Sequence, residues 1–309
     1  MERERYRRMR LILRQVERQH HDNPRFTHRD STILLVALWA ALHNKPISWA
    51  TDPQHWPGDL RPRPTMTGQG GLPSQSCMSR RLRGMDQDGK SDGNTRIFQL
   101  LEHWQTTLRQ RLPDADVKLI DGRGLVIGGC SKDPDAGFGY TATTKAKGYK
   151  LHWIVDSCSG AVDGWLIAPM NYPEQNAARY LITHLPPHTR YVLADNNYDG
   201  NDLYEQAGFY QHAQWMAMPR RDAKGLGRHW HSHWRLQVQP WLRTPQGRCT
   251  IGKTRIGIEQ VNGRLGCADV GLNHLPYHVR RLHRVTVWVA LKLLILTDLQ
   301  LTTWNRARA

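Results

Sequence analysis

The segment from Arg190 to Gly200 constrains the fold of this chain more than any other stretch. Its apolar run over 191–194 predicts a short strand, which leads directly into Asp195 and a group of turn residues. A helix is predicted next, near residues 203–207, with Asn201 or Asp202 as its cap. This order holds one carboxylate at the end of a sheet, where ligands of open α/β sheets bind. The alternative is that Asp195 only caps the turn or the helix.

Two further acids lie beside apolar segments. Asp121 ends the predicted strand 117–121, in which it shares a face with Leu119. Glu259 lies beside a helical apolar stripe, and Arg255 precedes it by four residues on the same helix face. A surface ion pair with Arg255 is the alternative role for Glu259.

The three acids suggest a site for a hard cation in a basic chain. Mg²⁺ prefers oxygen ligands and binds through one or two carboxylates together with substrate phosphates. Two such ions about 3.5–4 Å apart activate a nucleophile and stabilise a leaving oxygen in phosphodiester chemistry. Asp121, Asp195 and Glu259 are therefore the candidate ligands of two Mg²⁺ ions, with Mn²⁺ as the substitute ion.

The sequence motifs around these acids resemble those of one protein family. The order Asp121, Asp195, Glu259 is similar to the Asp-Asp-Glu triad of DDE-type insertion-sequence transposases. Residues 194–199 resemble the family's alanine-aspartate-x-x-tyrosine-aspartate box, and residues 147–152 resemble its glycine-tyrosine-lysine-x-histidine strand. Arg255 with Glu259 resembles its third box. The IS-four-type and IS-five-type groups are the most similar.

The resemblance implies a fold and an activity. The fold is a ribonuclease-H-like mixed α/β sheet flanked by helices, and the activity is metal-dependent DNA cleavage and strand transfer at the ends of an insertion sequence. Arg255 would orient Glu259 or contact a phosphate. The chain departs from the IS-four-type signature at Gly252 and Gly266, where that signature has tyrosine and lysine. A transposase-derived DNA-binding protein that does not cut, and a nuclease that does not transpose, remain as alternatives.

Charge favours a nucleic-acid partner. Lys and Arg number 43 against 27 Asp and Glu, which gives a net charge of +16. We expect double-stranded DNA, both element ends and target, as the partner, and a homodimer because two ends must be joined. The basic side chains expected to contact DNA are Arg80, Arg81, Arg83, Lys147, Lys150, Arg220 and Arg221.

Two regions are expected. Residues 1–95 would form an N-terminal helical DNA-binding region with a Pro/Gly-rich linker, and residues 96–309 the catalytic domain. A basic insertion at about 219–254 precedes the last catalytic helix, and its tryptophans either meet DNA or pack a small β subdomain. Within it, the alternating histidines 229–233 predict a basic strand, with a zinc site as a weaker alternative.

Several local predictions accompany this division. Further strands are expected at 149–155, 161–168 and 215–218, and residues 122–148 contain many glycines and small residues. Asp30 and its two neighbours are expected to cap one helix, and Ser74 another. The apolar stretch 285–301 falls short of the ~20 residues of a membrane span, so a buried helix is expected.

The cysteines and the N-terminus give information about the cellular compartment. Five widely spaced cysteines show no metal-ligand spacing and suggest reduced thiols. The N-terminus has no apolar signal core. A cytoplasmic protein that does not enter the membrane is therefore expected.

Overall fold

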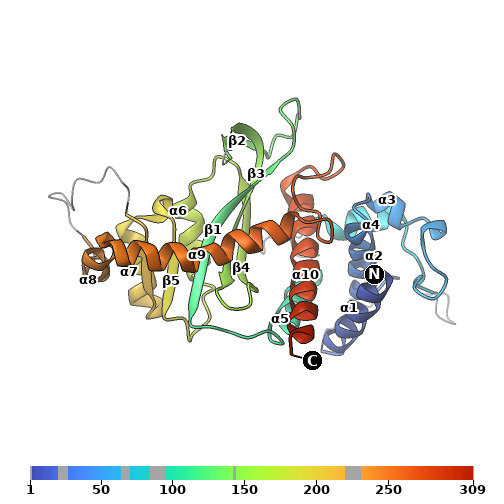
Figure 1. Ribbon diagram of the computed structural model, residues 1–309. Coiled ribbons are helices and arrows are strands. Elements are labelled where there is room, and N and C mark those ends of the chain that lie inside the picture. Colours follow the sequence, from blue (N-terminus) through green and yellow to red (C-terminus); the bar gives the residue numbers. More distant parts are fainter. Residues whose placement is uncertain are drawn as a thin grey trace. The chain divides into compact units, whose positions relative to one another are not determined.

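The computed structural model describes residues 2–19, 27–63, 70–83, 95–141, 144–219 and 231–308. The chain forms two compact units (Figure 1). One contains residues 1–111 and 265–309, and the other contains residues 112–264. These units do not coincide with the predicted boundary near residue 95, because helix α5 (Thr95–Arg109) belongs with the N-terminal helices.

The unit of residues 112–264 is built on a mixed sheet of six strands. The strands are β1 (Val117–Val126), β2 (Gly137–Tyr140), β3 (Lys145–Asp156), β4 (Val162–Pro169), β5 (Tyr191–Ala194) and β6 (Gln214–Ala217). Strands β1, β3 and β4 are antiparallel neighbours, and β5 and β6 continue the sheet parallel to β1. The resulting order β4-β3-β1-β5-β6 is the predicted ribonuclease-H-like arrangement, and β2 adds a short strand along β3.

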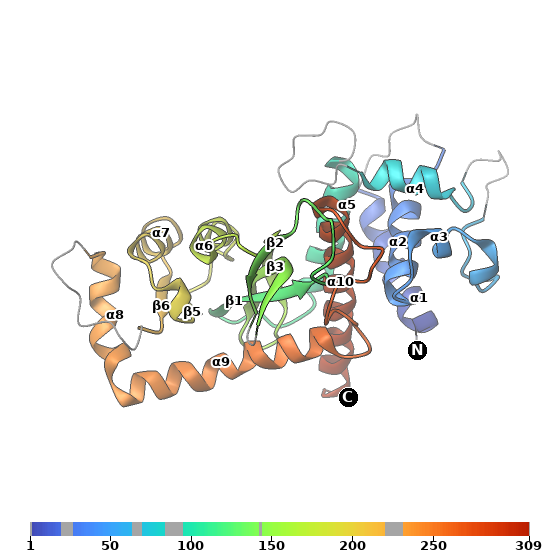
Figure 2. The same ribbon diagram turned by 90° about the horizontal axis from the view of Figure 1, so that it is seen from above.

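Helices cover both faces of this sheet. Helices α6 (Glu174–Ile182) and α7 (Asn201–Gln211) lie on one face, and α9 (Pro245–Gly266) crosses the other (Figure 2). One core cluster joins α6 and α7 to side chains from alternate strand positions, including Ile120 and Val192. Because strand side chains alternate between faces, the odd-numbered positions of β1 and β5 face α9.

The first strand is longer than predicted. It continues to Val126, beyond its predicted end at Asp121, and residues 137–140 form β2. Both extensions pair with β3. Glycine is rare in strands, so the sequence does not indicate this pairing. The close packing of β1 against β3 nevertheless requires glycine. A Cβ on Gly148 would lie 2.2 Å from the carbonyl oxygen of Leu125, so only glycine allows the two strands to approach this closely.

The basic insertion is helical where it is described. Helix α8 (His233–Arg243) precedes α9, so the predicted β subdomain and the predicted histidine strand are wrong for residues 231–254. Trp234 is partly buried against the core cluster, whereas Trp241 is 38% exposed. Trp230 and His229 lie outside the described residues.

The other unit consists of helices. They are α1 (Glu2–Glu17), α2 (Asp30–Leu42), α3 (Ile47–Ala50), the 3₁₀ turn Pro53–His55, α4 (Gln75–Leu82), α5 and α10 (Leu282–Arg306). The apolar face of α1, which includes Tyr6 and Met9, is buried. Asp298 in α10 accepts two hydrogen bonds from Arg8 at 2.7 and 2.5 Å, so α1 and α10 are joined through buried charge.

Helix α10 has the length and apolarity to cross a membrane, with a mean hydropathy of 1.5 in its most apolar window. Of that window, 89% is buried inside the protein. The helix also carries Lys292, whose Nζ donates to the carbonyl oxygens of Ala41 and Val270 and to Oδ1 of Asn44. These contacts support the predicted role of a core helix.

The two predicted helix caps have different outcomes. Ser74 Oγ accepts the backbone N–H of Cys77 at 3.3 Å, which confirms it as the cap of α4. Asp30 is not a cap, because α2 begins at that residue and Arg29 precedes it without a side-chain cap bond. The Asp30 carboxylate instead forms a buried ion pair with Arg81.

Candidate active site

Asp121 and Asp195 lie on neighbouring parallel strands. The register pairs Leu119 of β1 with Leu193 of β5, and each acid follows two positions later. Adjacent strands are about 4.8 Å apart, and residues two apart share a face. The fold therefore brings two acids that are 74 positions apart in sequence to one place, on the face crossed by α9.

Asp195 also caps the turn that follows it. Its Oδ1 accepts the backbone N–H of Asn197 at 2.8 Å, at the start of the 3₁₀ turn Asn196–Tyr198. The structural role and the proposed chemical role are thus compatible, because one carboxylate oxygen makes this bond.

Glu259 is carried to the same face by α9. The helix approaches β1 closely at Gly257, where an added Cβ would lie 3.4 Å from Leu119 Cδ1. Ile258 and Val261 are buried, and Glu259 is exposed. One turn further along, Asn262 Nδ2 donates to Asp121 Oδ2 at 2.8 Å.

The protein environment raises the pKa of both aspartates. Burial raises the pKa of Asp121 to about 6, and the negative charge of Asp195 adds to this effect. The Gly122 N–H and the Asn262 amide act in the opposite direction. Burial, followed by the charge of Glu174, raises the pKa of Asp195. Carboxylates that are held together and desolvated are typical of functional sites, and a bound cation would reverse the shift.

Two arginines supply positive charge at this face. Arg255 lowers the pKa of both aspartates, although not enough to offset burial. Its Nε is buried and has no hydrogen-bond partner in the described part of the chain. No ion pair joins Arg255 to Glu259 among the described residues, so the surface-pair alternative for Glu259 is not supported. Arg123 is attracted to Asp121 and Glu259, while burial lowers its pKa.

The tyrosine and histidine of the sequence boxes, Tyr198 and His152, lie behind Asp121, on the other face of the sheet. The hydroxyl of Tyr198 and Nδ1 of His152 lie 3.2 and 3.3 Å from the point that a Cβ on Gly122 would occupy. Both side chains are buried. Burial lowers the pKa of His152 to about 3, so its ring is neutral at physiological pH. These groups support the strand and do not reach the α9 face.

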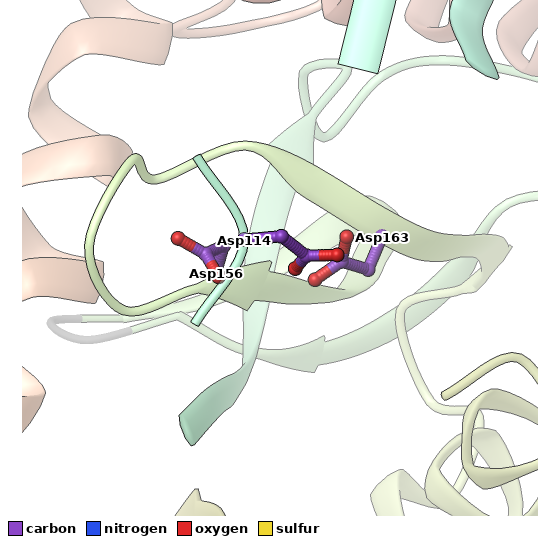
Figure 3. A group of neighbouring side chains, drawn as sticks. All are labelled: Asp114, Asp156 and Asp163. Atoms are coloured by element: carbon purple, nitrogen blue, oxygen red, sulfur yellow. The ribbon is translucent and has the colours of Figure 1, made fainter. Parts of the chain in front are cut away.

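A different group of acids forms the tightest carboxylate cluster in the described residues. Oxygens of Asp114, Asp156 and Asp163 all lie within 4.8 Å of one another (Figure 3). The ammonium group of Lys118 lies 2.5, 3.0 and 3.0 Å from these three carboxylates and is itself fully buried. The Lys118 ammonium group therefore already lies where a metal ion would bind, and we interpret this cluster as a structural ion-pair network.

The residues predicted to contact DNA have diverse positions. Arg80 and Arg83 are exposed on and just after α4, whereas Arg81 is buried against Asp30 and donates to the His28 carbonyl at 3.0 Å. Arg81 is thus a structural residue in this fold, contrary to the prediction. Arg220 and Arg221 lie outside the described residues.

The two lysines of β3 have local partners. Lys150 Nζ forms an ion pair with Glu174 at 2.7 Å, beside the site, and Lys147 Nζ donates to the Ser131 carbonyl at 2.7 Å. Both side chains are partly exposed, so their predicted contacts with DNA stay predictions.

The predicted zinc alternative finds no support in the described residues. His231 Nδ1 contacts Asn201 Oδ1 at 3.4 Å, and His233 is the exposed first residue of α8. No histidine belongs to a group of potential metal ligands in the ranges that the structure describes.

Three residues at the site were not predicted from the sequence. Asn262 follows Glu259 by three positions, Arg123 follows Asp121 by two, and Glu174 begins α6. The first two could have been found from periodicity alone, because positions three apart on a helix and two apart on a strand share a face. Glu174 has no such signal.

Two of the three comparisons with known proteins found a match. The family model described as "Transposase DDE domain" matches residues 113–297. Among solved structures, the chain is similar to the piggyBac transposase in a cryo-EM synaptic complex with hairpin DNA, with 10% identity and a TM-score of 0.47. The similarity covers 78% of this chain and 56% of that one. The search of curated proteins found no match.

Proposed function

We propose that this chain, which belongs to the family of transposases with a DDE domain, cuts DNA at the ends of an insertion sequence and joins the freed ends to a target. The observation that supports this proposal is the placement of Asp121 and Asp195 at equivalent positions on β1 and just after β5, each two residues beyond the paired Leu119 and Leu193, with Asp121 hydrogen-bonded to the helix of Glu259. The family match includes all three acids.

The three acids would hold divalent ions, Mg²⁺ first and Mn²⁺ as the substitute. The donor set fits, because it consists of carboxylate oxygens and because burial, together with the charge of Asp195, raises the pKa of Asp121, an effect that a bound cation would oppose. Such ions, when bound, activate a water or a 3′-hydroxyl and neutralise charge on the leaving oxygen.

The remaining residues would bind and orient the DNA. Arg255 faces both aspartates, so it can hold a scissile phosphate next to them. Lys150 can exchange Glu174 for a DNA phosphate, since Glu174, its ion-pair partner, lies near enough to Asp195 to raise the pKa of that acid. Arg80 and Arg83 are exposed on another part of the chain and would contact the DNA backbone.

The experiment compares cleavage by wild type and by Asp195→Asn. The substrate is DNA that carries the gene's own flanking ends, with Mg²⁺ or with chelator. We expect metal-dependent cuts by wild type and a loss on the order of 100-fold or more in the variant, as for removal of one electrostatic catalytic group. Asp202→Asn is the matched control, because Asp202 is an exposed acid of α7 whose partner is Arg179.

The outcomes separate the alternatives. Cleavage by Asp195→Asn at the wild-type rate would refute the site. Specific binding by wild type without any cut would favour a DNA-binding protein that has lost activity, and cutting without joining to a second DNA would favour a nuclease. The family match favours neither of these alternatives.

Assembly and location follow from the same proposal. Joining two ends requires two active sites, so we propose a homodimer in the active complex. The described cysteines are all free, and four of the five are exposed. Free exposed thiols are typical of a reducing compartment, so we propose a cytoplasmic location.

A further inference from the structure

Asn262 contacts the first acid of the triad from the helix that carries the third. Its Nδ2 donates to Asp121 Oδ2 at 2.8 Å, and this bond spans 141 positions of sequence. Asn262 lies three residues after Glu259, so the two side chains share a face of α9. A hydrogen bond that holds Asn262 on Asp121 therefore also sets where Glu259 lies relative to Asp121.

The backbone of Asn262 is held from the same strand. Arg123, two residues after Asp121 on β1, donates a hydrogen bond from Nη1 to the Asn262 carbonyl oxygen. That carbonyl is in the last turn and a half of α9, where a cation is favoured by the helix dipole. Together with the close approach of Gly257 to Leu119, these contacts join α9 to β1 along two turns.

In the side-chain amide of Asn262, the nitrogen makes a hydrogen bond and the oxygen does not. Its Oδ1 is buried and has no hydrogen-bond partner in the described part of the chain. A buried acceptor without a partner costs about 1–3 kcal/mol. The side chain keeps this arrangement because its donor end meets a carboxylate, and a charge-assisted hydrogen bond is stronger than a neutral one.

We propose that Asn262 is a positioning residue of the transposase site, which orients the Asp121 carboxylate and sets the place of Glu259 before metal binds. This inference rests on the proposed function, because it assigns Asn262 a role toward the same metal site. Groups that hydrogen-bond to a metal-binding carboxylate fix its orientation, and their loss typically costs 10–100-fold in metal affinity.

The same contact has a second chemical interpretation, in which the amide turns over and Oδ1 becomes a metal ligand. A substitution distinguishes the two. Asn262→Asp removes the donor and puts a second negative charge against Asp121, which harms a positioning role. The same change would supply a strong ligand oxygen if position 262 bound metal directly.

The test measures Mn²⁺ binding to the full chain by electron paramagnetic resonance, without DNA. The variants are Asn262→Ala, Asn262→Asp and, as the matched control, Gln260→Ala, which removes an exposed amide two positions earlier on the same helix. We expect a 10–100-fold weaker Mn²⁺ affinity for both Asn262 variants and no change for Gln260→Ala. DNA binding in chelator should be unchanged in all three.

A kinetic measurement accompanies the binding assay. In cleavage, the Mg²⁺ concentration for half-maximal rate should rise in Asn262→Ala more than the rate at saturating Mg²⁺ falls. Thermal unfolding checks the fold. If Asn262→Ala does not fold, Asn262→Gln replaces it in the assay. This variant keeps an amide on a longer side chain, and a 10–100-fold weaker Mn²⁺ affinity is again expected.

Two results would overturn the inference. Affinity of Asn262→Ala within twofold of wild type would show that the amide does not prepare the site. Tighter Mn²⁺ binding by Asn262→Asp would show that position 262 is a ligand. A wild type that neither binds Mn²⁺ nor cuts would instead refute the proposed function, which is distinct from the first two results because those require a metal-binding wild type.

Discussion

Asp121 shows how one residue is changed by its surroundings. As an isolated side chain it would be ionised at any pH above about 4. In the fold, burial and the charge of Asp195 raise its pKa to about 6, although the Asn262 amide and the Gly122 N–H favour the ionised form. The site therefore stores electrostatic strain that a divalent cation can relieve.

This raised pKa predicts a pH dependence of stability without metal. Because the folded pKa exceeds the unfolded one, the ionised carboxylate destabilises the fold above about pH 6, and this penalty disappears as the pH falls below the unfolded value. Asp121→Asn should therefore be more stable than wild type at pH 7 by at most roughly 3 kcal/mol, at about 1.36 kcal/mol for each pH unit between the two pKa values.

Urea unfolding in chelator at pH 7 and pH 4 measures this difference. The advantage of Asp121→Asn should shrink toward pH 4, and saturating Mg²⁺ should reverse it by stabilising only wild type. A variant that is less stable than wild type at pH 7 would contradict the raised pKa of Asp121.

At the scale of elements, the second acid box and the insertion are connected by charge. Arg235 of α8 lies 2.8 Å from Asp199, the last residue of the box, and also donates to Asn201 Oδ1 at 3.0 Å. Both members of the pair are largely buried, at 15% and 5% exposure. The insertion was predicted to contact DNA through its basic residues. Arg235 instead joins α8 to the start of α7 through this ion pair and hydrogen bond.

Arg235→Met should destabilise the unit of residues 112–264 by roughly 3 kcal/mol, because breaking a buried pair leaves Asp199 without compensation. It should also raise hydrogen exchange in α8. Arg243→Met is the control, since Arg243 is exposed at the end of the same helix. Equal unfolding midpoints for the two variants would show that the pair contributes nothing to stability.

At the scale of the whole molecule, the net charge of +16 predicts strong salt dependence of DNA binding. Each phosphate that is neutralised contributes a slope of about −0.9 to the plot of log binding constant against log salt concentration. The double variant Arg80→Gln/Arg83→Gln should lower the magnitude of the slope by about 2 if both arginines contact phosphates.

Fluorescence anisotropy over a range of NaCl concentrations measures these slopes. Arg7→Gln serves as a control, because this exposed arginine of α1 pairs with Asp59. An unchanged slope in the double variant would remove α4 from the DNA interface and with it the main support for an N-terminal DNA-binding region, which stays a prediction.

Short motifs in this sequence were sufficient to predict the family and most of the main strands. Strand alternation and turn residues are local, so the text around Asp195 identifies a strand that ends at an acid. The family match confirms the resemblance drawn from the boxes. The predicted mixed α/β sheet flanked by helices is also confirmed. The roles of the acids stay predictions.

Tertiary structure alone decided which charged residues are structural and which face the site. Arg81, Arg235 and Lys118 look like surface cations in the sequence, yet each is buried against a carboxylate from a distant position. The contact of Asn262 with Asp121 likewise joins segments 141 positions apart. Such pairings depend on which elements the fold brings together, and the period of a single helix or strand carries no information about its distant neighbours.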